Sequence, residues 1–388
     1  MLPITPPDQF KSPYSSPSAF AGNVDFLSTH LGKDVRPNDD DNYWIQDWCL
    51  YSAIKQEFDH RPWFEWPQPL RDRNPEALKH FENKSSTYLQ SQIQFSYEWS
   101  GLKEYASSKN IELIGDVPIF VNHDSADVWA HRELFLLDED GMPTEVAGTP
   151  PDYFNKDGQK WGTVLYNWEA HRKDNWKWWI QRMNRMKQLF HIVRIDHFLG
   201  FDRCWAIPTT AKNGKKGRWL DGPVEEIVPL MIDTMGGPHH IIAENLGIAT
   251  PEAESIRIEA GIPGMSVLQF GYDGDFKTNP HHPSNYDDSV IVYTGTHDNN
   301  TLLGWWNELP ESIKLKLGND IDTDELIWSL IRLAFDNSQL GCIVPLQDLL
   351  ELPSSARMNF PGTLHGNWLW SLNDLKSAEY AIKKFGLI

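Results

Sequence analysis

The stretch that decides the fold is His191-Ile-Val-Arg-Ile-Asp196-His197, an apolar run of the strand type that ends in a carboxylate. Two later segments have the same form: Ile241-Ile-Ala-Glu244-Asn245 and Tyr293-Thr-Gly-Thr-His297-Asp298-Asn299. Carboxylates at the carboxyl ends of separate buried strands are how a parallel α/β barrel gathers an active site. These segments therefore predict a barrel that carries acidic chemistry at its rim.

Helix-like and strand-like stretches alternate from about residue 86 onward, which is typical of a parallel sheet. Apolar residues recur at helical spacing over 171–190 and again over 323–335. A further helix is predicted after Thr250 as N-cap, with Pro251 in its first turn and Gly261 at its end. Besides 191–196, strands are expected at 111–121, 241–244, 265–270, 289–294 and 341–344. So many strands in series favour an α/β TIM-type barrel over a small doubly wound sheet.

The charge and the cysteines limit the class of protein and its surroundings. The formal net charge is -19, which argues against nucleic acid or an anionic membrane as partner, because both need a basic face. No apolar run is long enough to span a bilayer, and Met1-Leu-Pro-Ile-Thr-Pro-Pro has no secretory-signal pattern. The three cysteines are widely spaced, which fits free thiols in a reducing compartment. We therefore expect a cytoplasmic protein.

Aromatic residues are abundant, with 18 Trp, 18 Phe and 12 Tyr. Trp and Tyr combine a flat apolar face with a polar edge, and sugars have apolar C–H faces edged with hydroxyls. Some of these rings are therefore candidates for glycan stacking, although core packing accounts for many of them.

The acidic strand ends suit glycosidic chemistry, which needs two carboxylates at the scissile bond. Arg194 and Asp196 are two apart on a strand, so their side chains share one face, and the cation favours an ionised carboxylate. The alternative is an ion pair that only fixes packing. Glu244 follows three apolar residues, and partial desolvation would suit a general acid. The alternative for Glu244 is a hydrogen bonder at the barrel mouth, and for Asp298 a strand-terminating turn.

Other positions carry weaker signals. Asp116 is expected to end a strand and to lie near Arg194 or Asp196. The segment from Gly148 to Trp161 is rich in Pro and aromatic residues and is expected to form a loop over a cleft. The pairs His239-His240 and His281-His282 lack metal-ligand spacing, so no metal site is expected.

Taken together, the motifs closely resemble the 4-α-glucanotransferases, also called amylomaltases or disproportionating enzymes, of the α-amylase superfamily. The segments that carry the resemblance are Ser12-Pro-Tyr14, Ser18-Ala-Phe-Ala-Gly-Asn23, Gly115-Asp-Val-Pro-Ile-Phe120, Pro150-Pro-Asp-Tyr-Phe154, Val193-Arg-Ile-Asp-His-Phe198, Ala243-Glu-Asn-Leu-Gly247, Tyr293-Thr-Gly-Thr-His-Asp298, Arg357-Met-Asn-Phe-Pro-Gly362 and Gly366-Asn-Trp368. The resemblance covers nearly the whole chain. It implies a (β/α)8 barrel with inserted subdomains and transfer of α-1,4-glucan segments.

The resemblance also implies roles for individual residues. Asp196 would be the nucleophile, Glu244 the acid/base and Asp298 the residue that holds the distorted sugar. Residues expected around the reacting glucose are Arg194, His297 and Asp116, and those expected to contact the glucan are Tyr14, Trp161, Phe270 and Asn359. α-1,4-Glucans and maltooligosaccharides would be donors, with glucose among the acceptors, and no cofactor or metal is implied.

Two departures from the family pattern affect the expected organisation. Leu2-Pro-Ile-Thr-Pro resembles only the end of the family's second strand, and the inserted subdomain, at about 24–85, is short. The sequence therefore predicts one catalytic barrel domain over 1–388 that is incomplete at its N-terminus. Unpaired strand edges would favour self-association. Alternative functions are a retaining α-glucan hydrolase and a non-catalytic glucan-binding protein.

Overall fold

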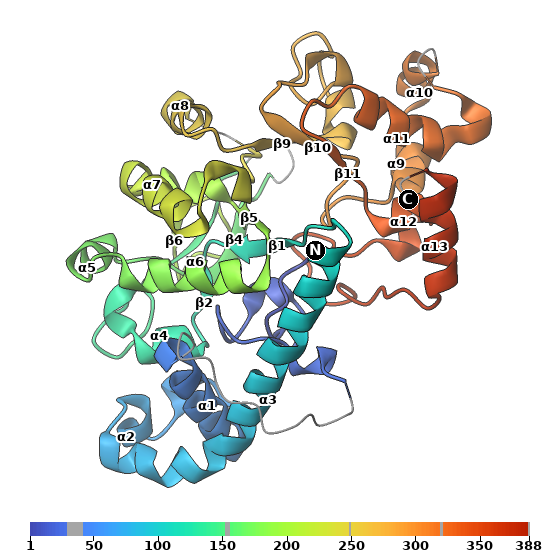
Figure 1. The fold of residues 1–388 in the computed structure, drawn as a ribbon. Coiled ribbons are helices and arrows are strands. Elements are labelled where there is room, and N and C mark those ends of the chain that lie inside the picture. Colours follow the sequence, from blue (N-terminus) through green and yellow to red (C-terminus); the bar gives the residue numbers. More distant parts are fainter. Residues whose placement is uncertain (29–41, 152–155, 248–249, 319–320, 387–388) are drawn as a thin grey trace. The chain divides into compact units, whose positions relative to one another are not determined.

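The structure is a computed structural model that describes residues 1–28, 42–151, 156–247, 250–318 and 321–386. The chain divides into two compact units (Figure 1). The first unit comprises Met1–Glu244 and Ala249–Ile256, and the second comprises Asn245–Ile248 and Arg257–Ile388. The helix α8 (Pro251–Glu259) crosses the border between them.

Within the described residues, the first unit contains a small parallel sheet and seven α-helices that lie wholly in this unit. They are α1 (Asn42–Glu57), α2 (Gln68–Arg71), α3 (Pro75–Ser108), α4 (Ala126–Ala130), α5 (Trp168–Lys173), α6 (Lys177–Leu189) and α7 (Val224–Met235). The long helix α3 begins at Asn74, whose side chain accepts hydrogen bonds from the N–H groups of Glu76 and Ala77. It runs on through residue 85, where the inserted subdomain was expected to end. Lys103 on α3 donates to three carbonyls at the end of α6, so α3 also caps a second helix.

The parallel sheet of the first unit has the order β1-β5-β8. Its strands are β1 (Ile114–Pro118), β5 (Ile192–Asp196) and β8 (Ile241–Ala243). Their central apolar residues are buried, as expected of parallel strands that are covered on both faces. The register pairs Asp116 with Arg194 and Ile195 with Ala243. This register decides which polar side chains meet at the carboxyl end of the sheet.

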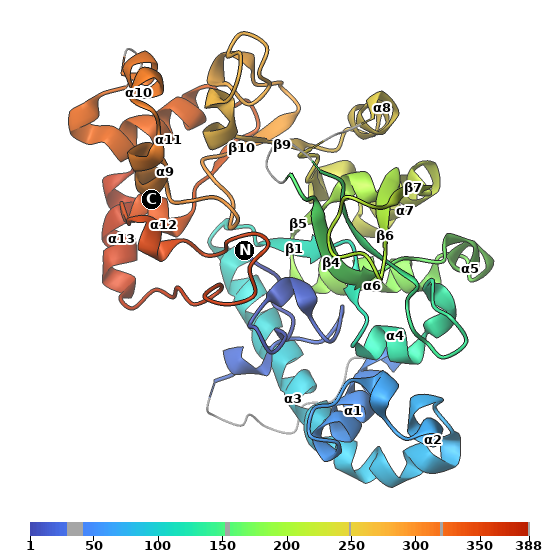
Figure 2. The ribbon, with the colours of Figure 1, turned by 180° about the vertical axis from the view of Figure 1, so that it is seen from behind.

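A second sheet in the first unit is antiparallel and was not predicted (Figure 2). Its order is β2-β4-β3-β6-β7, with β2 (Val121–Asn122), β3 (Glu145–Thr149), β4 (Gln159–Val164), β6 (Arg203–Pro208) and β7 (Arg218–Asp221). The expected loop from Gly148 to Trp161 is therefore wrong at both ends, because Gly148 lies in β3 and Trp161 in β4. A Cβ at Gly148 would lie 2.1 Å from the Gln159 carbonyl oxygen, so the glycine permits this strand pairing. Asp152, Tyr153 and Phe154 lie outside the described residues.

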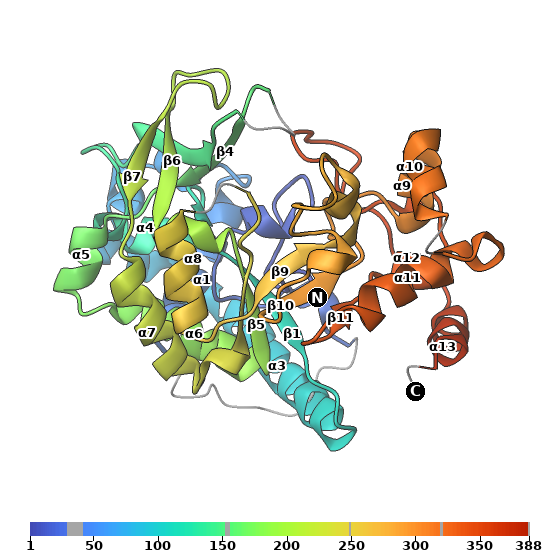
Figure 3. The ribbon, with the colours of Figure 1, turned by 90° about the horizontal axis from the view of Figure 1, so that it is seen from above.

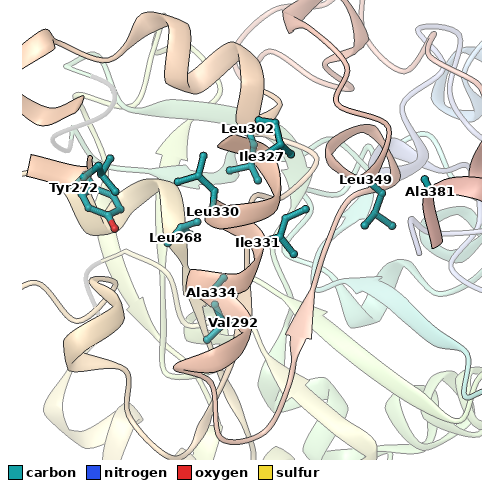
Figure 4. Packing of buried hydrophobic residues seen from close by; sticks show 11 residues of the cluster. Leu268, Tyr272, Val292, Leu302, Ile327, Leu330, Ile331, Ala334, Leu349 and Ala381 are labelled. Atoms are coloured by element: carbon teal, nitrogen blue, oxygen red, sulfur yellow. The ribbon is translucent and has the colours of Figure 1, made fainter. Parts of the chain in front are cut away.

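The second unit contains another parallel sheet, of order β11-β10-β9, seen from above in Figure 3. Its strands are β9 (Gly264–Val267), β10 (Val290–Tyr293) and β11 (Cys342–Ile343). The helices that accompany it are α9 (Leu302–Glu308), α10 (Glu311–Leu317), α11 (Leu326–Asp336), α12 (Leu346–Leu349) and α13 (Leu375–Lys384). Figure 4 shows their shared core, to which Val292 of β10, Leu302, Leu330 and Leu349 belong.

The expected strands correspond to the two parallel sheets, so the predicted parallel α/β class is confirmed. Several elements differ in detail. The strand expected at 111–121 is β1 over Ile114–Pro118, and Val121 belongs to β2 of the antiparallel sheet. The helix expected over 323–335 is α11, which begins at Leu326. The strand expected at 265–270 ends at Val267, where the short helix η8 (Leu268–Tyr272) begins. The helix expected over 171–190 is interrupted before Lys177, because Trp176 adopts a left-handed backbone with φ 59°. The predicted start of α8 is confirmed, since the Thr250 hydroxyl accepts from the Ala253 N–H at 3.0 Å.

The three cysteines are free, as expected. Cys49 and Cys204 are buried and Cys342 is half-buried. Burial raises the pKa of each thiol to about 12, so these side chains act as small apolar groups at neutral pH.

His171 of α5 makes the stability of the first unit pH-dependent. Its side chain is fully buried among the rings of Tyr166, Trp168 and Trp178, and burial lowers its pKa to about 4. In the unfolded chain the pKa of a histidine is near 6.5. The contribution of neutral His171 to the free energy of unfolding is therefore fully present above pH 6.5, and up to about 3 kcal/mol of it is lost as pH falls towards 4. We expect His171→Gln to remove this dependence.

Urea unfolding of wild type and His171→Gln at pH 7.5 and pH 5 measures the effect. The stability advantage of the wild type should shrink or reverse at pH 5. An equal change with pH in both proteins would contradict the role of His171.

Candidate active site

Arg194 on β5 joins two carboxylates of the first unit. Its Nη1 donates to both carboxylate oxygens of Asp116, at 2.8 and 2.7 Å, and its Nη2 lies 3.1 Å from Asp196 Oδ1. Asp116 is the register partner of Arg194 on β1, and Asp196 lies two residues further along β5 on the same face. The expected contacts of Arg194 with Asp196 and Asp116 are confirmed, although Asp116 lies within β1 and not at its end.

The neighbouring carboxylates keep the Arg194 guanidinium charged. Burial works against the charge on Arg194, but the carboxylates of Asp116 and Asp196 outweigh it and hold the pKa of the guanidinium well above its ordinary value. Side chains of Arg194 and Asp116 are only 10% and 6% exposed, whereas that of Asp196 is 28% exposed. The guanidinium thus supports negative charge on a carboxylate that solvent or substrate can still reach.

Tyr14 extends this group. Its hydroxyl donates to Asp116 Oδ2 at 2.6 Å from the short helix η1 (Pro13–Ser15). Burial and then the charge on Asp116 raise the pKa of Tyr14 well above its ordinary value, so the phenol remains a neutral donor. Tyr14, Asp116, Arg194 and Asp196 therefore form one continuous polar chain.

We expect Arg194→Met to destabilise the first unit strongly, because it leaves Asp116 buried without its cation. Removing one partner of a buried ion pair typically costs about 3–5 kcal/mol. The double variant Arg194→Met/Asp116→Asn should recover much of the loss, because the uncompensated charge is gone. Urea unfolding of the two variants and wild type measures this; additive losses would contradict the role of the buried charge.

Glu244 is the first residue after β8, the strand that pairs with β5. Its N–H donates to the Ile195 carbonyl at 3.0 Å, continuing the pairing of β5 with β8. The Glu244 carboxylate, in a residue only 8% exposed, accepts a hydrogen bond from the His197 N–H at 2.7 Å. Adjacent strands are about 5 Å apart, so the two carboxylates leave the sheet as neighbours.

His197 orients Glu244 and borders a tryptophan. Its backbone is left-handed, with φ 51° and ψ 48°, which is uncommon for a residue other than glycine and aims its N–H at Glu244. Its ring meets Trp161 edge to face at 4.9 Å. Burial lowers the pKa of His197 although Glu244 acts in the opposite direction, so the ring is neutral at neutral pH. His197 was absent from the predicted site, since only its position after Asp196 pointed to it.

Trp161 offers a surface for a sugar ring. It lies on β4, is 36% exposed, and its indole N–H donates to Gln159 Oε1 at 3.2 Å. An exposed indole beside His197 suits stacking on the apolar face of a glucose unit.

The second unit carries Asp298 in a turn beyond β10. The turn is closed by Asn299, whose side-chain oxygen accepts from the Thr296 N–H at 2.9 Å. Asp298 Oδ1 accepts from Asn359 Nδ2 at 2.6 Å and lies 3.5 Å from His297 Nε2. Its side chain is 47% exposed. The strand-terminating turn that was the alternative interpretation of Asp298 is thus present. It is closed by Asn299, so the carboxylate of Asp298 faces Asn359 and His297.

Arg357 supports this turn and was not predicted as a site residue. Its Nη2 donates to the Asp298 carbonyl at 2.6 Å and its Nε to the Asn359 carbonyl at 2.8 Å. The Asn359 N–H donates in turn to the His297 carbonyl at 3.1 Å. The motif that begins at Arg357 was the only sequence signal for this role.

The ten predicted site residues fall into both units. Those of the first unit are Tyr14, Asp116, Trp161, Arg194, Asp196 and Glu244, and those of the second are Phe270, His297, Asp298 and Asn359. Contacts bring His297, Asp298 and Asn359 together in the second unit. Phe270 lies on η8, with its ring 5.7 Å from that of His281.

Within the described ranges, no cluster of three or more His, Cys, Asp or Glu side chains could hold a metal ion. Within the same ranges, none of the helices combines the length and apolar character needed to cross a membrane.

Two carboxylates at the ends of adjacent parallel strands, an arginine-held aspartate and a buried glutamate, have the residue types that chemistry on glycosidic bonds needs. Residues 35–376 match the family model of glycoside hydrolase family 77, described as 4-alpha-glucanotransferase, and the chain belongs to this family.

Relatives agree with this assignment. The chain is 42% identical over 346 residues to the 4-alpha-glucanotransferase of Thermus thermophilus, covering 85% of this chain and 68% of the relative. It is 38% identical over 375 residues to the chloroplastic/amyloplastic 4-alpha-glucanotransferase of Arabidopsis thaliana, covering 94% and 64%. A solved amylomaltase from Streptococcus agalactiae in complex with acarbose matches with a TM-score of 0.89 at 30% identity, covering 99% of this chain and 91% of that one. The chain thus spans about two thirds of the length of the first two relatives.

Proposed function

We propose that this chain is a retaining 4-α-glucanotransferase that moves a segment of an α-1,4-glucan to the 4-hydroxyl of an acceptor glucose or glucan. The observation that carries the proposal is that Asp196, held by Arg194, and Glu244 each follow the last paired residues of two adjacent parallel strands, Ile195 of β5 and Ala243 of β8. Membership of the family and the similarity to the Thermus thermophilus enzyme support it.

In the first half of the reaction, Asp196 attacks the anomeric carbon while Glu244 protonates the leaving oligosaccharide oxygen. A covalent glucosyl–enzyme forms as the glycosidic bond breaks. Retaining enzymes place the two carboxyl groups about 5–5.5 Å apart, and residues that leave neighbouring strands suit this short separation.

In the second half, Glu244 takes the proton from the 4-hydroxyl of the acceptor, which attacks the same carbon and releases Asp196. The two inversions retain the configuration. If water replaced the acceptor, the same carboxylates would perform hydrolysis, so exclusion of water from the intermediate distinguishes the two activities.

Other residues would bind and orient the sugar. We assign to Asp298 the hydroxyls of the distorted glucose, with His297 and Asn359 as its neighbours. Arg194 and Asp116 would support the nucleophile, and Tyr14, Trp161 and Phe270 would contact the glucan. The hydrogen bond from Asn359 to Asp298 supports a shared task for these two residues.

The proposal extends to the fold that the family resemblance implies, a (β/α)8 barrel within one catalytic domain. The parallel order of β1-β5-β8 and of β11-β10-β9 supports it. A cytoplasmic location and self-association remain predictions from the sequence, and light scattering of the purified chain tests the second.

The test of the proposed function is incubation of the chain with maltotriose, with products resolved by length over time. Glucose together with a ladder of longer maltooligosaccharides would establish transfer. New reducing ends that match substrate loss one for one would establish hydrolysis. Unchanged maltotriose with measurable binding would leave a glucan-binding protein.

A further inference from the structure

Asp348 of α12 is a buried carboxylate that the proposed reaction does not use. The residue is 1% exposed. Its Oδ2 accepts from the Thr294 hydroxyl at 2.9 Å, and its Oδ1 accepts from the Leu302 N–H at 2.8 Å. Both partners are themselves buried. One carboxylate therefore holds two points that are distant from it in the sequence.

These two points are the ends of the turn that carries His297 and Asp298. Thr294 is the first residue after β10, and Leu302 is the first residue of α9. The segment 295–301 leaves the sheet at one and enters the helix at the other. Fixing both ends to a single group sets the span of the turn, and with it the position of Asp298.

Burying a carboxylate at this place in the core costs free energy, because the charge is removed from water. Leu349 beside it in the chain, together with Leu302 and Leu330, belongs to the apolar cluster of this unit. Burial raises the pKa of Asp348 to about 6, although the Leu302 N–H and the Thr294 hydroxyl act in the opposite direction. Buried charges are usually retained where their hydrogen bonds specify a geometry that apolar packing does not.

Other groups hold the middle and the helical side of the turn. Arg357 and Asn359 bond to Asp298 itself. Gln269 donates to the Asn300 carbonyl at 2.8 Å, and the Thr301 hydroxyl caps α9 by accepting from the Gly304 N–H at 3.1 Å. These bonds fix the helical side of the turn. Asp348 is the group that ties this side to the end of β10.

We propose that Asp348 is a positioning residue for the reaction: it accepts hydrogen bonds from Thr294 and Leu302 and so holds Asp298 where the distorted glucose binds. The inference rests on the proposed function of Asp298. Asp348 itself does not touch the substrate.

The main test compares Asp348→Ala with Asp348→Asn. Alanine removes both hydrogen bonds, and a loss of placement of about 1 Å can cost roughly a hundredfold in rate. Asparagine can accept from the Leu302 N–H and donate to a rotated Thr294 hydroxyl, without the buried charge. We expect kcat of maltotriose transfer to fall roughly a hundredfold in Asp348→Ala and less than tenfold in Asp348→Asn, with KM little changed in both.

Leu330→Ala serves as the matched control, because Leu330 lies in the same core cluster but holds neither end of the turn. It should lower the thermal midpoint while the folded protein keeps its kcat. If Leu330→Ala and Asp348→Ala lose kcat equally at the same folded fraction, the role of Asp348 is structural only and the inference is overturned. An Asp348→Ala variant with wild-type kcat overturns it as well.

Hydrogen exchange over 294–302 separates this inference from the proposed function. Asp348→Ala should exchange its Leu302 amide at least tenfold faster than Leu330→Ala, whether or not the chain is active. If the wild type makes no maltooligosaccharide ladder, the proposed function fails. Unchanged exchange in Asp348→Ala would then also show that Asp348 does not hold the two ends of the turn. If the wild type makes the ladder but exchange and kcat are unchanged in Asp348→Ala, only the positioning role fails.

Discussion

Replacing Asp196 by Ala should lower glucan transfer by at least about a thousandfold while maltooligosaccharide binding remains, because the carboxylate that we propose as the nucleophile is gone. Asp196 is the most exposed of the three residues in the Arg194 ion-pair group, and its loss leaves the bidentate pair of Arg194 with Asp116 in place. The fold should therefore survive. The rate is measured with maltotriose and binding by calorimetry.

Asp221→Ala is the control for Asp196→Ala. Asp221 also ends a strand, β7, but it is exposed and lies in the antiparallel sheet. Its replacement should leave transfer unchanged. Near-normal turnover in Asp196→Ala would reject the assignment of the nucleophile, whereas loss of binding in the same variant would point to a wider structural effect.

Glu244→Gln should reduce transfer from maltotriose by roughly a hundredfold to ten-thousandfold, the range for loss of a general acid–base group. The glutamine oxygen can still accept the hydrogen bond from the His197 N–H, so the turn after β5 should be preserved. The effect is then chemical and not structural, since an amide cannot act as an acid or a base near neutral pH.

A donor with fluoride as its leaving group isolates the acid step, because fluoride departs without protonation. Glu244→Gln should release a burst of fluoride equal to the enzyme concentration from α-maltosyl fluoride, because the maltosyl–enzyme forms but lacks the base that its transfer to an acceptor needs. Asp196→Ala should show no burst. Equal impairment of Glu244→Gln with maltotriose and with the fluoride in the burst phase would remove Glu244 from the acid role.

Much of the parallel framework could be predicted from the sequence. Short apolar runs with punctuated ends identified the strands that became β1, β5, β8, β9, β10 and β11. The spacing of Arg194 and Asp196 placed them on one face because side chains alternate along a strand. The Thr250 cap and Gly261 at the end of α8 were likewise local features, and local features can be read from neighbouring residues alone.

The antiparallel sheet could not be predicted in the same way. Its strands β3 and β4 contain glycines and mixed polar residues, and they are stable because β2 and β6 pair with their outer edges. The break between α5 and α6 has a similar origin. Trp176 fits the helical period, yet its ring packs on His171, and its backbone turns left-handed to allow this.

Residue types and short spacings in the chain were enough to predict the family, the parallel strands and the acidic residues at or beyond their ends. Which groups these side chains meet became clear from the three-dimensional fold. Tyr14 donates to a carboxylate on β1, His197 turns its amide to Glu244, and Asp348 on α12 accepts hydrogen bonds from both ends of the turn that carries Asp298. Such hydrogen bonds join residues tens of positions apart, so they follow from strand register and packing, which the order of residues along one segment does not encode.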